Sequence, residues 1–196
     1  MKLLVVYCHP VRASFCAAIR DVVVTAAEAG GHDVQLLDLY ASGFDPVMSE
    51  QERTDFHTEG SNEIPVKAHL DALKWCDGMI FVYPTWWMAQ PAMLKGWLDR
   101  VWIPHVTFRM PGDVISWKPL MTNIKLLGVV TTLGSPWWWW TLGVCAPGRK
   151  VLMRSIRTCC HPRCKTFWLA LHLMDSASAS ARQGFLEKVR RRVARL

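Results

Sequence analysis

Short apolar runs alternate along the chain with longer segments of helical period. The runs show little polar alternation, which is typical of strands in a parallel sheet whose two faces are both covered. The longer segments begin at capping residues and end near glycines, as amphipathic helices do. This pattern predicts five strands, at Lys2–Tyr7, Val34–Leu37, Met79–Tyr83, Ile124–Val130 and Thr166–Leu171.

Helices are expected between these strands. Ser14 is placed to cap a helix that runs to about Ala29, and Ser49 and Glu52 have the spacing of a capping box. Further helices are expected at Val66–Cys76, after Pro91, at Val151–Arg157 and from about Ser178 to the end, with an irregular segment at Trp102–Leu120. Five strand–helix alternations predict an α/β fold with an open, doubly wound sheet. We expect one domain that spans residues 1–196.

Composition adds an unusual number of tryptophans. Hydrophobic residues make up 51% of the chain and charged residues 20%, which excludes intrinsic disorder. There are 11 Trp, including the pair Trp86–Trp87 and the run Trp137–Trp140. Two interpretations stay open: heavy packing in the core and at a subunit interface, or a platform for a planar ligand.

The net charge of +7 is concentrated at one end of the chain. Residues 149–196 contain 12 Lys and Arg against two Asp and Glu. Such a region is compatible with nucleic acid, an acidic membrane surface or a phosphorylated ligand. We favour a solvated helix face, because Phe185, Val189 and Val193 form one apolar stripe. Nucleic acid is not expected, since no recognition module accompanies the charge.

The seven cysteines are odd in number and suggest no disulfide framework. The chain starts without a signal peptide, and the uncharged segment 126–148 contains too many glycines and prolines for a membrane-spanning helix. We therefore expect a cytoplasmic protein without a transmembrane segment. Cys159, Cys160, His161 and Cys164 have some likeness to a metal cluster, but adjacent cysteines rarely both reach one ion. We expect these cysteines in the core and no metal.

Three loops follow predicted strand ends, where doubly wound sheets bind ligands. The loop at 8–13 leads into a helix N-terminus, which favours an anion, although Ser14 could also act as a cap alone. The loop at 84–90 presents two indoles, and the loop at 131–140 presents hydroxyl and N–H groups. Together they describe a planar, partly polar ring system with a phosphate tail, which fits a flavin better than a nicotinamide.

Four motifs stand out in this chain: His9-Pro10 with Ser14-Phe15, Asp38-Leu39-Tyr40 with Phe44-Asp45-Pro46, Tyr83-Pro84-Thr85-Trp86-Trp87, and the long stretch Pro91–Val101. Together they resemble the NAD(P)H:quinone oxidoreductase family of flavodoxin-like flavoproteins. The resemblance implies a three-layer sandwich around a five-stranded parallel sheet in the order 2-1-3-4-5. It also implies a homodimer with bound FAD, or else FMN. In that family hydride passes from NAD(P)H through the flavin to a quinone or similar flat acceptor, by a ping-pong sequence.

The resemblance also implies which residues form the site. The expected flavin-binding residues are His9, Arg12, Ser14, Phe15, Cys16, Pro84, Thr85, Trp86, Trp87, Thr131, Thr132, Leu133 and Gly134. The expected acceptor pocket comprises Met88, Trp137 and Trp139, with Phe108 covering the site of the partner subunit. No catalytic residue is expected beyond the flavin itself.

One departure from the family concerns the acceptor. Some members carry a Tyr and a His after the third loop, and the corresponding positions here are about Trp139 and Cys145. Neither can take part in a proton relay, so the family's best-known quinone specificity is not expected to carry over unchanged. The alternative function is a flavin-bound ancillary subunit that regulates a partner, such as a potassium-efflux system.

Overall fold

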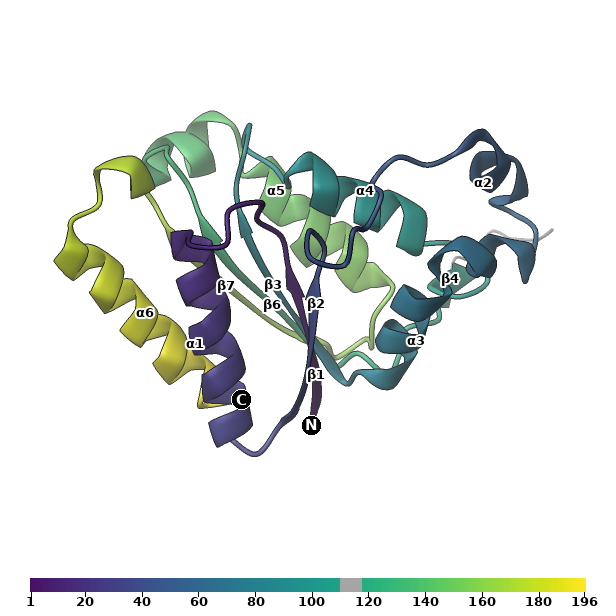
Figure 1. The fold of residues 1–196 in the computed structure, drawn as a ribbon, viewed down its shortest axis with the longest axis horizontal. Coiled ribbons are helices and arrows are strands. Elements are labelled where there is room, and N and C mark those ends of the chain that lie inside the picture. Colours follow the sequence, from purple (N-terminus) through teal and green to yellow (C-terminus); the bar gives the residue numbers. More distant parts are fainter. Residues whose placement is uncertain (110–117) are drawn as a thin grey trace.

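The computed structural model describes residues 1–109 and 118–196. Its centre is a five-stranded parallel sheet in the spatial order β2-β1-β3-β6-β7 (Figure 1). The strands are β1 (Lys2–Tyr7), β2 (Asp33–Asp38), β3 (Gly78–Pro84), β6 (Leu126–Thr132) and β7 (Lys165–Leu171). All five predicted strands are confirmed, and in chain order the arrangement is the predicted 2-1-3-4-5.

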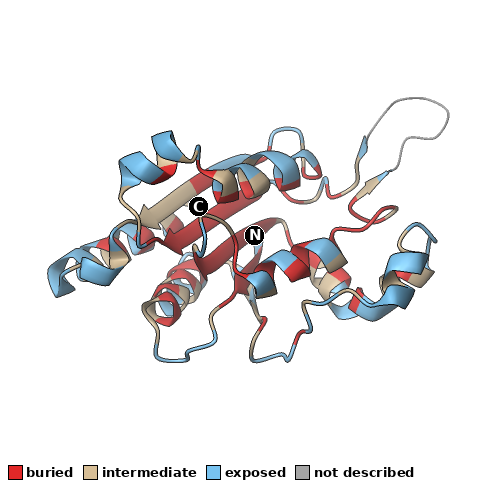
Figure 2. Cartoon of the chain, turned by 90° about the horizontal axis from the view of Figure 1, so that it is seen from above, coloured by how far each residue is buried: buried red, intermediate tan, exposed pale blue. Residues whose placement is uncertain are grey.

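Helices cover both faces of the sheet, which makes the fold a three-layer sandwich (Figure 1). On one face, α1 (Phe15–Ala29) and α6 (Ala179–Val193) bury apolar stripes that include Ile19, Val23 and Val189. On the other face lie α3 (Lys67–Trp75), α4 (Ala92–Val101) and the π-helix η3 (Val151–Ile156). Because β1, β3 and β6 are covered in this way, the centre of the sheet is the most deeply buried part of the protein, whereas the outer strands β2 and β7 are partly exposed (Figure 2).

Smaller elements complete the described chain. They are α2 (Glu50–Asp55), the 3₁₀-helix η1 (Ser61–Val66), the short antiparallel pair β4 (Phe108–Arg109) and β5 (Lys118–Pro119), the π-helix η2 (Trp139–Gly143), α5 (Pro147–Lys150) and the 3₁₀-helix η4 (Met174–Ser176). Of the segment expected to be irregular, residues 110–117 lie outside the described residues. Its ends form β4 and β5.

The tryptophan run is helical, where a loop was expected. Trp140 is buried and stacks on Trp168 of β7, with ring centroids 5.5 Å apart and planes 20° apart. Its neighbours Trp137, Trp138 and Trp139 stay exposed. Burying one indole of four fixes the rotation of η2, so Trp140 belongs to the core and not to a pocket entrance.

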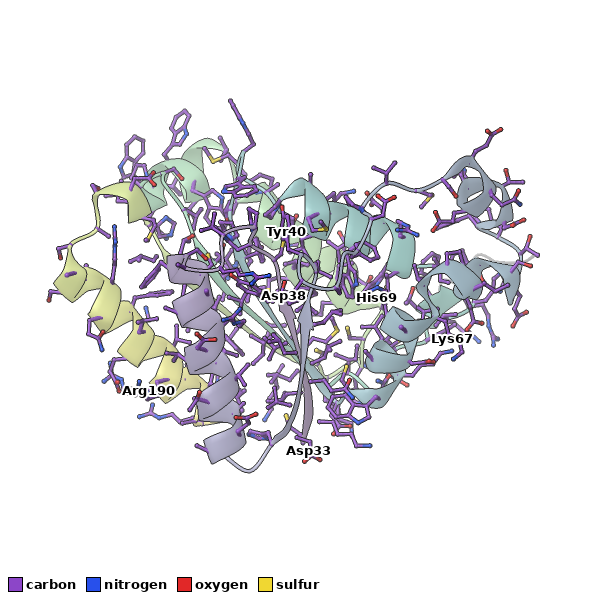
Figure 3. The ribbon with its side chains drawn as sticks, viewed as in Figure 1. Asp33, Asp38, Tyr40, Lys67, His69 and Arg190 are labelled. Atoms are coloured by element: carbon purple, nitrogen blue, oxygen red, sulfur yellow. The ribbon has the colours of Figure 1, made fainter. Side chains whose placement is uncertain are left out.

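The strands begin on one side of the molecule and end on the opposite side, and these two sides are called here the edge where the strands begin and the edge where they end. In Figure 3, Asp33 and Asp38 mark the start and the end of β2, and the parallel strands share this direction. Both chain ends lie near the edge where the strands begin (Figure 1). No helix in residues 1–109 or 118–196 is long and apolar enough to cross a membrane.

Candidate functional site

A cavity of about 240 Å³ opens where the strands end. It lies at the point where the strand order reverses between β1 and β3, the usual ligand site of such sheets. Nine of the predicted flavin-binding residues line it: His9, Phe15, Cys16, Pro84, Thr85, Trp86, Thr132, Leu133 and Gly134. Loops that are far apart in the chain are thus brought together at one edge of the sheet.

The first loop ends in the N-terminus of α1. Ser14 caps this helix, since its Oγ accepts a hydrogen bond from Ala17 N–H at 3.1 Å. The same Oγ lies 3.3 Å from the Tyr7 hydroxyl. The first-turn N–H groups of a helix have no acceptor inside the helix, so those of Phe15 and Cys16 can serve an anion. Capping and anion binding are therefore compatible roles at this helix end.

His9 is suited to donate a hydrogen bond into the cavity. Burial lowers the pKa of its imidazole, so the ring is neutral near pH 7. Its Nδ1 lies 3.0 Å from Val11 N and accepts that N–H. The same Nδ1 lies 3.2 Å from the Val11 carbonyl, but a backbone N–H can only donate, so the neutral tautomer that avoids two opposed hydrogens carries its proton on Nε2. His9 thus offers one N–H donor at the rim, beside Trp86, whose ring centroid is 6.1 Å away.

The second loop turns back within two residues. Trp86 and Ala89 exchange backbone hydrogen bonds of 3.1 and 3.0 Å across the turn. Trp87 and Met88 between them have φ of 46° and 64°, as in a type I′ turn, which normally takes Gly or Asn. Left-handed backbone is costly for bulky side chains, so this turn stores strain at the rim of the cavity. It presents Trp87 almost fully to solvent, 98% exposed.

The contacts beneath this turn hold it in place. The Met88 carbonyl accepts from Gly148 N–H at 3.1 Å and from Trp140 Nε1–H at 3.4 Å. A Cβ at Gly148 would lie 2.9 Å from Ala89 Cα, so only glycine permits this approach. The buried Gln90 side chain donates to the Gly148 carbonyl at 2.7 Å.

The two threonines at the end of β6 have different roles. Thr131 Oγ1 is fully buried, donates to the Tyr83 carbonyl at 2.7 Å and lies 2.8 Å from Thr85 Oγ1. A hydroxyl has one proton, so Thr85 must donate to Thr131, and neither hydroxyl has a proton left for a ligand. Thr132 lines the cavity, where its Oγ1 is 3.6 Å from Cys16 Sγ. Burial raises the pKa of the Cys16 thiol to about 11, so this sulfur is a neutral group.

A fourth loop, after β7, also lines the cavity and was missed from the sequence. It contributes Met174 and Asp175 of η4. The Asp175 carboxylate packs against Gly134, because a Cβ added at Gly134 would lie 2.6 Å from Asp175 Oδ2. The signal was available, because this loop follows the carboxyl end of the fifth predicted strand as the others follow theirs.

The remaining predicted residues do not line this cavity. Arg12 is exposed on the first loop, Ser14 is half-buried, Thr131 is buried, and Trp87 is almost fully exposed on the turn. Met88 packs beside the small cluster of Leu133, Trp140 and Ala146. Trp137, which precedes η2, and Trp139, its first residue, are both exposed. Phe108 of β4 packs partly buried against the core of its own chain.

The cysteines behave as core residues in most positions. All but Cys145 are buried, and none of the seven is in a disulfide. In the two described stretches, no three His, Cys, Asp or Glu side chains are placed to hold a metal ion.

Comparison with known proteins agrees with this architecture. Residues 1–142 match the flavodoxin-like fold family, so the chain belongs to that family. Smu.1420 from Streptococcus mutans is similar over 100% of both chains, with a TM-score of 0.84 and 29% identity. An FMN-dependent NADH-azoreductase from Bacillus anthracis, solved with FMN, shares the fold over 99% of this chain and 98% of its own, with a TM-score of 0.78 and 15% identity.

Proteins that are similar in sequence confirm the resemblance to NAD(P)H:quinone oxidoreductases that the motifs indicated. NAD(P)H dehydrogenase [quinone] 1 of Rattus norvegicus is 30% identical over 150 residues, 68% of this chain and 54% of the relative. The NAD(P)H oxidoreductase YcaK of Escherichia coli is 31% identical over 129 residues, 63% of this chain and 66% of the relative. The chain therefore spans between about half and two thirds of the lengths of these relatives.

Proposed function

We propose that this protein is a flavin-dependent NAD(P)H oxidoreductase that reduces a quinone or a similar flat acceptor. The observation that carries the proposal is the single cavity at the strand-order reversal, where a helix N-terminus, an indole and exposed N–H donors converge. The names of the relatives, NAD(P)H oxidoreductase and NAD(P)H dehydrogenase [quinone], support the same reaction class.

The residues of the cavity fit a flavin. The first turn of α1 and the neutral His9 supply N–H donors for a phosphate. Pro84, Thr85 and Trp86 offer an apolar wall for the ring system, and Thr132 and Gly134 face its polar edge. Donors at that edge stabilise negative charge on a reduced ring. A flavin held by these residues would supply the hydride chemistry that links NAD(P)H to an acceptor.

The exposed residues around the cavity support a homodimer. Trp87 and the exposed face of η2 form an apolar surface beside the mouth of the cavity. We propose that a second copy covers this surface, with residues 1–196 acting as one flavin-binding unit in each copy. The unbonded thiols support a reducing, cytoplasmic setting.

A cofactor titration tests the site directly. Apoprotein is titrated separately with FAD and FMN, the visible spectrum is recorded, and the released cofactor is weighed by mass spectrometry. We expect saturable binding with FAD the tighter ligand, although the FMN in the azoreductase of the same fold makes FMN the necessary comparison. Protein that stays colourless with both flavins would overturn the site assignment.

Steady-state kinetics test the reaction. The flavin-loaded protein is given NADPH or NADH with a panel of quinones and other planar acceptors. We expect parallel-line kinetics, as a ping-pong sequence requires. Tight flavin binding with negligible turnover on every acceptor would instead favour the ancillary role in a partner complex, for which the basic C-terminal region supplies a docking surface.

A further inference from the structure

A second cavity lies at the opposite edge of the sheet, where the strands begin. Its volume is about 420 Å³. It is bounded by the starts of β6 and β7, by the turn that precedes β7, and by the last turn of α6. Its lining residues are Met1, Lys125, Leu126, His161, Arg163, Lys165, Arg192, Arg195 and Leu196. None of them belongs to the candidate flavin site.

Five lysine and arginine side chains line this cavity, no aspartate or glutamate does, and the α-carboxylate of Leu196 is the one anionic group on a lining residue. Within residues 1–109 and 118–196, no carboxylate forms an ion pair with any of the five. One acidic residue, Asp77, is hydrogen-bonded to a residue of the cavity: its backbone carbonyl accepts from Lys125 N–H at 2.7 Å. Its carboxylate accepts from Lys2 N–H at 3.0 Å. Asp77 does not line the cavity, and five cationic side chains against the single Leu196 carboxylate leave an excess of positive charge there.

The dipole of α6 explains only part of this arrangement. Cations at a helix C-terminus are favourable, which accounts for arginines near the end of α6. Arg190 and Arg191 on that helix pair with Glu187, at 2.7 and 3.9 Å. Lys125 and Lys165, however, lie at the starts of two adjacent strands, β6 and β7, where Lys165 N–H donates to the Lys125 carbonyl at 2.9 Å. Like charges from separate segments repel one another unless an anion lies between them.

The Arg192 side chain is preorganised beside the cavity by a contact within the protein. Its guanidinium carbon lies 4.4 Å from the centroid of the Phe167 ring on β7, a cation–π contact that directs the side chain across the sheet. Arg190, by contrast, is exposed on α6 (Figure 3). A pre-ordered guanidinium loses less entropy when it binds the oxygens of a phosphate in a bidentate manner. The cavity therefore contains one preorganised anion ligand and four further cations around it.

We propose that this cavity binds a small phosphorylated molecule with two or more negative charges and an apolar portion. The cations bind the phosphate oxygens, and Leu126 contacts the apolar portion. A volume of about 420 Å³ is in the range of small-molecule sites, and a concave surface suits such a ligand better than a flat membrane. Because the site lies at the far edge of the sheet, its ligand does not compete with a flavin. The proposal is independent of the proposed function.

Pyrophosphate binding tests this site. Pyrophosphate is titrated by calorimetry at constant ionic strength into the protein as isolated, and again after addition of excess flavin, which would fill the phosphate site at the N-terminus of α1 and leave binding at the second cavity unchanged. Arg192→Gln and Lys165→Gln are compared with Arg190→Gln, which removes the same charge from the same end of the molecule outside the cavity. We expect about tenfold weaker binding for each of the first two variants and less than threefold for the control. Circular dichroism confirms that all three remain folded.

Three results would overturn the proposal. Pyrophosphate could fail to bind the wild-type protein in a saturable way. The three variants could weaken binding equally, which would mean a diffuse field and no site. Binding could also be restricted to vesicles that contain phosphatidylserine, which would assign the basic surface to a membrane.

Discussion

At the scale of single residues, exposure separates tryptophans of different roles. Trp97 is fully buried and contacts Phe81 and Trp102, with ring centroids 6.1 and 5.7 Å away. Trp87 is 98% exposed on a strained turn. A side chain that contributes so little to the core and yet occupies an unfavourable backbone conformation is explained by binding, either to a ligand or to another subunit.

Replacing Trp87 by alanine tests that explanation. We expect Trp87→Ala to change the free energy of unfolding by less than about 0.5 kcal/mol, because an exposed indole packs against little. Flavin or acceptor affinity should fall severalfold through loss of an aromatic contact. Trp97→Ala is the matched control and should cost about 3–5 kcal/mol. Urea denaturation and flavin titration measure the two effects, and unfolding of the Trp87 variant would show that this indole is structural.

The two threonines at the end of β6 provide a second test. Thr131→Val removes the donor to the Tyr83 carbonyl, which should destabilise the fold by about 1–3 kcal/mol while the folded protein still binds flavin. Thr132→Val faces the cavity and should weaken flavin binding with a smaller change in stability. The midpoint of urea unfolding and the flavin dissociation constant are measured for each variant. If Thr131→Val weakened flavin binding and Thr132→Val mainly destabilised the fold, the hydroxyl that faces the ligand would be that of Thr131 and not that of Thr132.

At the scale of elements, α2 is attached to the body of the protein by one ion pair. Glu52 Oε1 accepts from Arg100 Nη2 of α4 at 2.6 Å, and Glu52 Oε2 accepts from Ser49 N–H at 2.9 Å. Both side chains of the ion pair are largely buried. Burial by itself raises the pKa of Glu52, but the hydrogen bonds from Ser49 and Arg100 outweigh it and hold the pKa below its usual value.

This depressed pKa predicts how stability depends on pH. A carboxylate whose pKa is lower in the folded state stabilises the fold above its unfolded pKa, and this contribution is lost as the pH falls through the folded value. Glu52→Gln should therefore be less stable than the wild type at pH 7, by about 1–3 kcal/mol. The difference should shrink once the pH falls below about 4.

Urea denaturation between pH 3 and pH 7 measures this difference. Glu50→Gln is the matched control, since Glu50 lies in the same first turn without an ion pair to the described residues. Its effect should be small at every pH. A loss of stability in Glu52→Gln that is independent of pH would contradict the explanation.

Elements with one dominant signal were predictable from the sequence, and those set by tertiary contacts were not. Apolar runs located all five strands, and the signal is strongest for β1, β3 and β6, which are buried on both faces. The helix η2 was predicted as a loop because Gly134 and Pro136 precede it and Gly143 ends it, whereas its formation depends on Trp140 packing against Trp168 of a distant strand. The left-handed turn at Trp87 and Met88 could not be predicted, because neither position holds the Gly or Asn that usually marks such a turn. Hydrogen bonds from Gly148 and Trp140, which are distant in sequence, stabilise it instead.

At the scale of the whole molecule, the two edges of the sheet have different chemistry. The edge where strands end combines N–H donors with exposed indoles, and the edge where they begin gathers cations. The loops that form the first edge follow from topology once the strands are known, which is why the motifs pointed there. The second edge was visible in the sequence only as a basic C-terminal region, because Lys125 and Arg192 are 67 positions apart and meet only through the fold.

The exposed indoles beside the first edge predict the oligomeric state. Trp87, Trp137, Trp138 and Leu142 are each more than half exposed, and the turn that carries Trp87 contacts η2 through Met88 and Trp140. Surfaces of this kind on a folded chain mark association sites, and tryptophans are frequent hot spots in them. We therefore expect sedimentation equilibrium to give about twice the chain mass of 22.3 kDa.

The double variant Trp137→Ser, Trp138→Ser identifies the surface responsible for this association. It should raise the dissociation constant of the dimer by more than about tenfold, since each lost hot spot costs about 2 kcal/mol. Leu36→Ser is the control, because Leu36 is exposed on β2 at the other end of the sheet and its loss should leave the dimer intact. Flavin affinity should fall with dissociation if the partner copy covers the cavity. A monomeric wild-type protein would contradict the predicted dimer. Equal dissociation of the Leu36 variant would show that the association surface lies elsewhere.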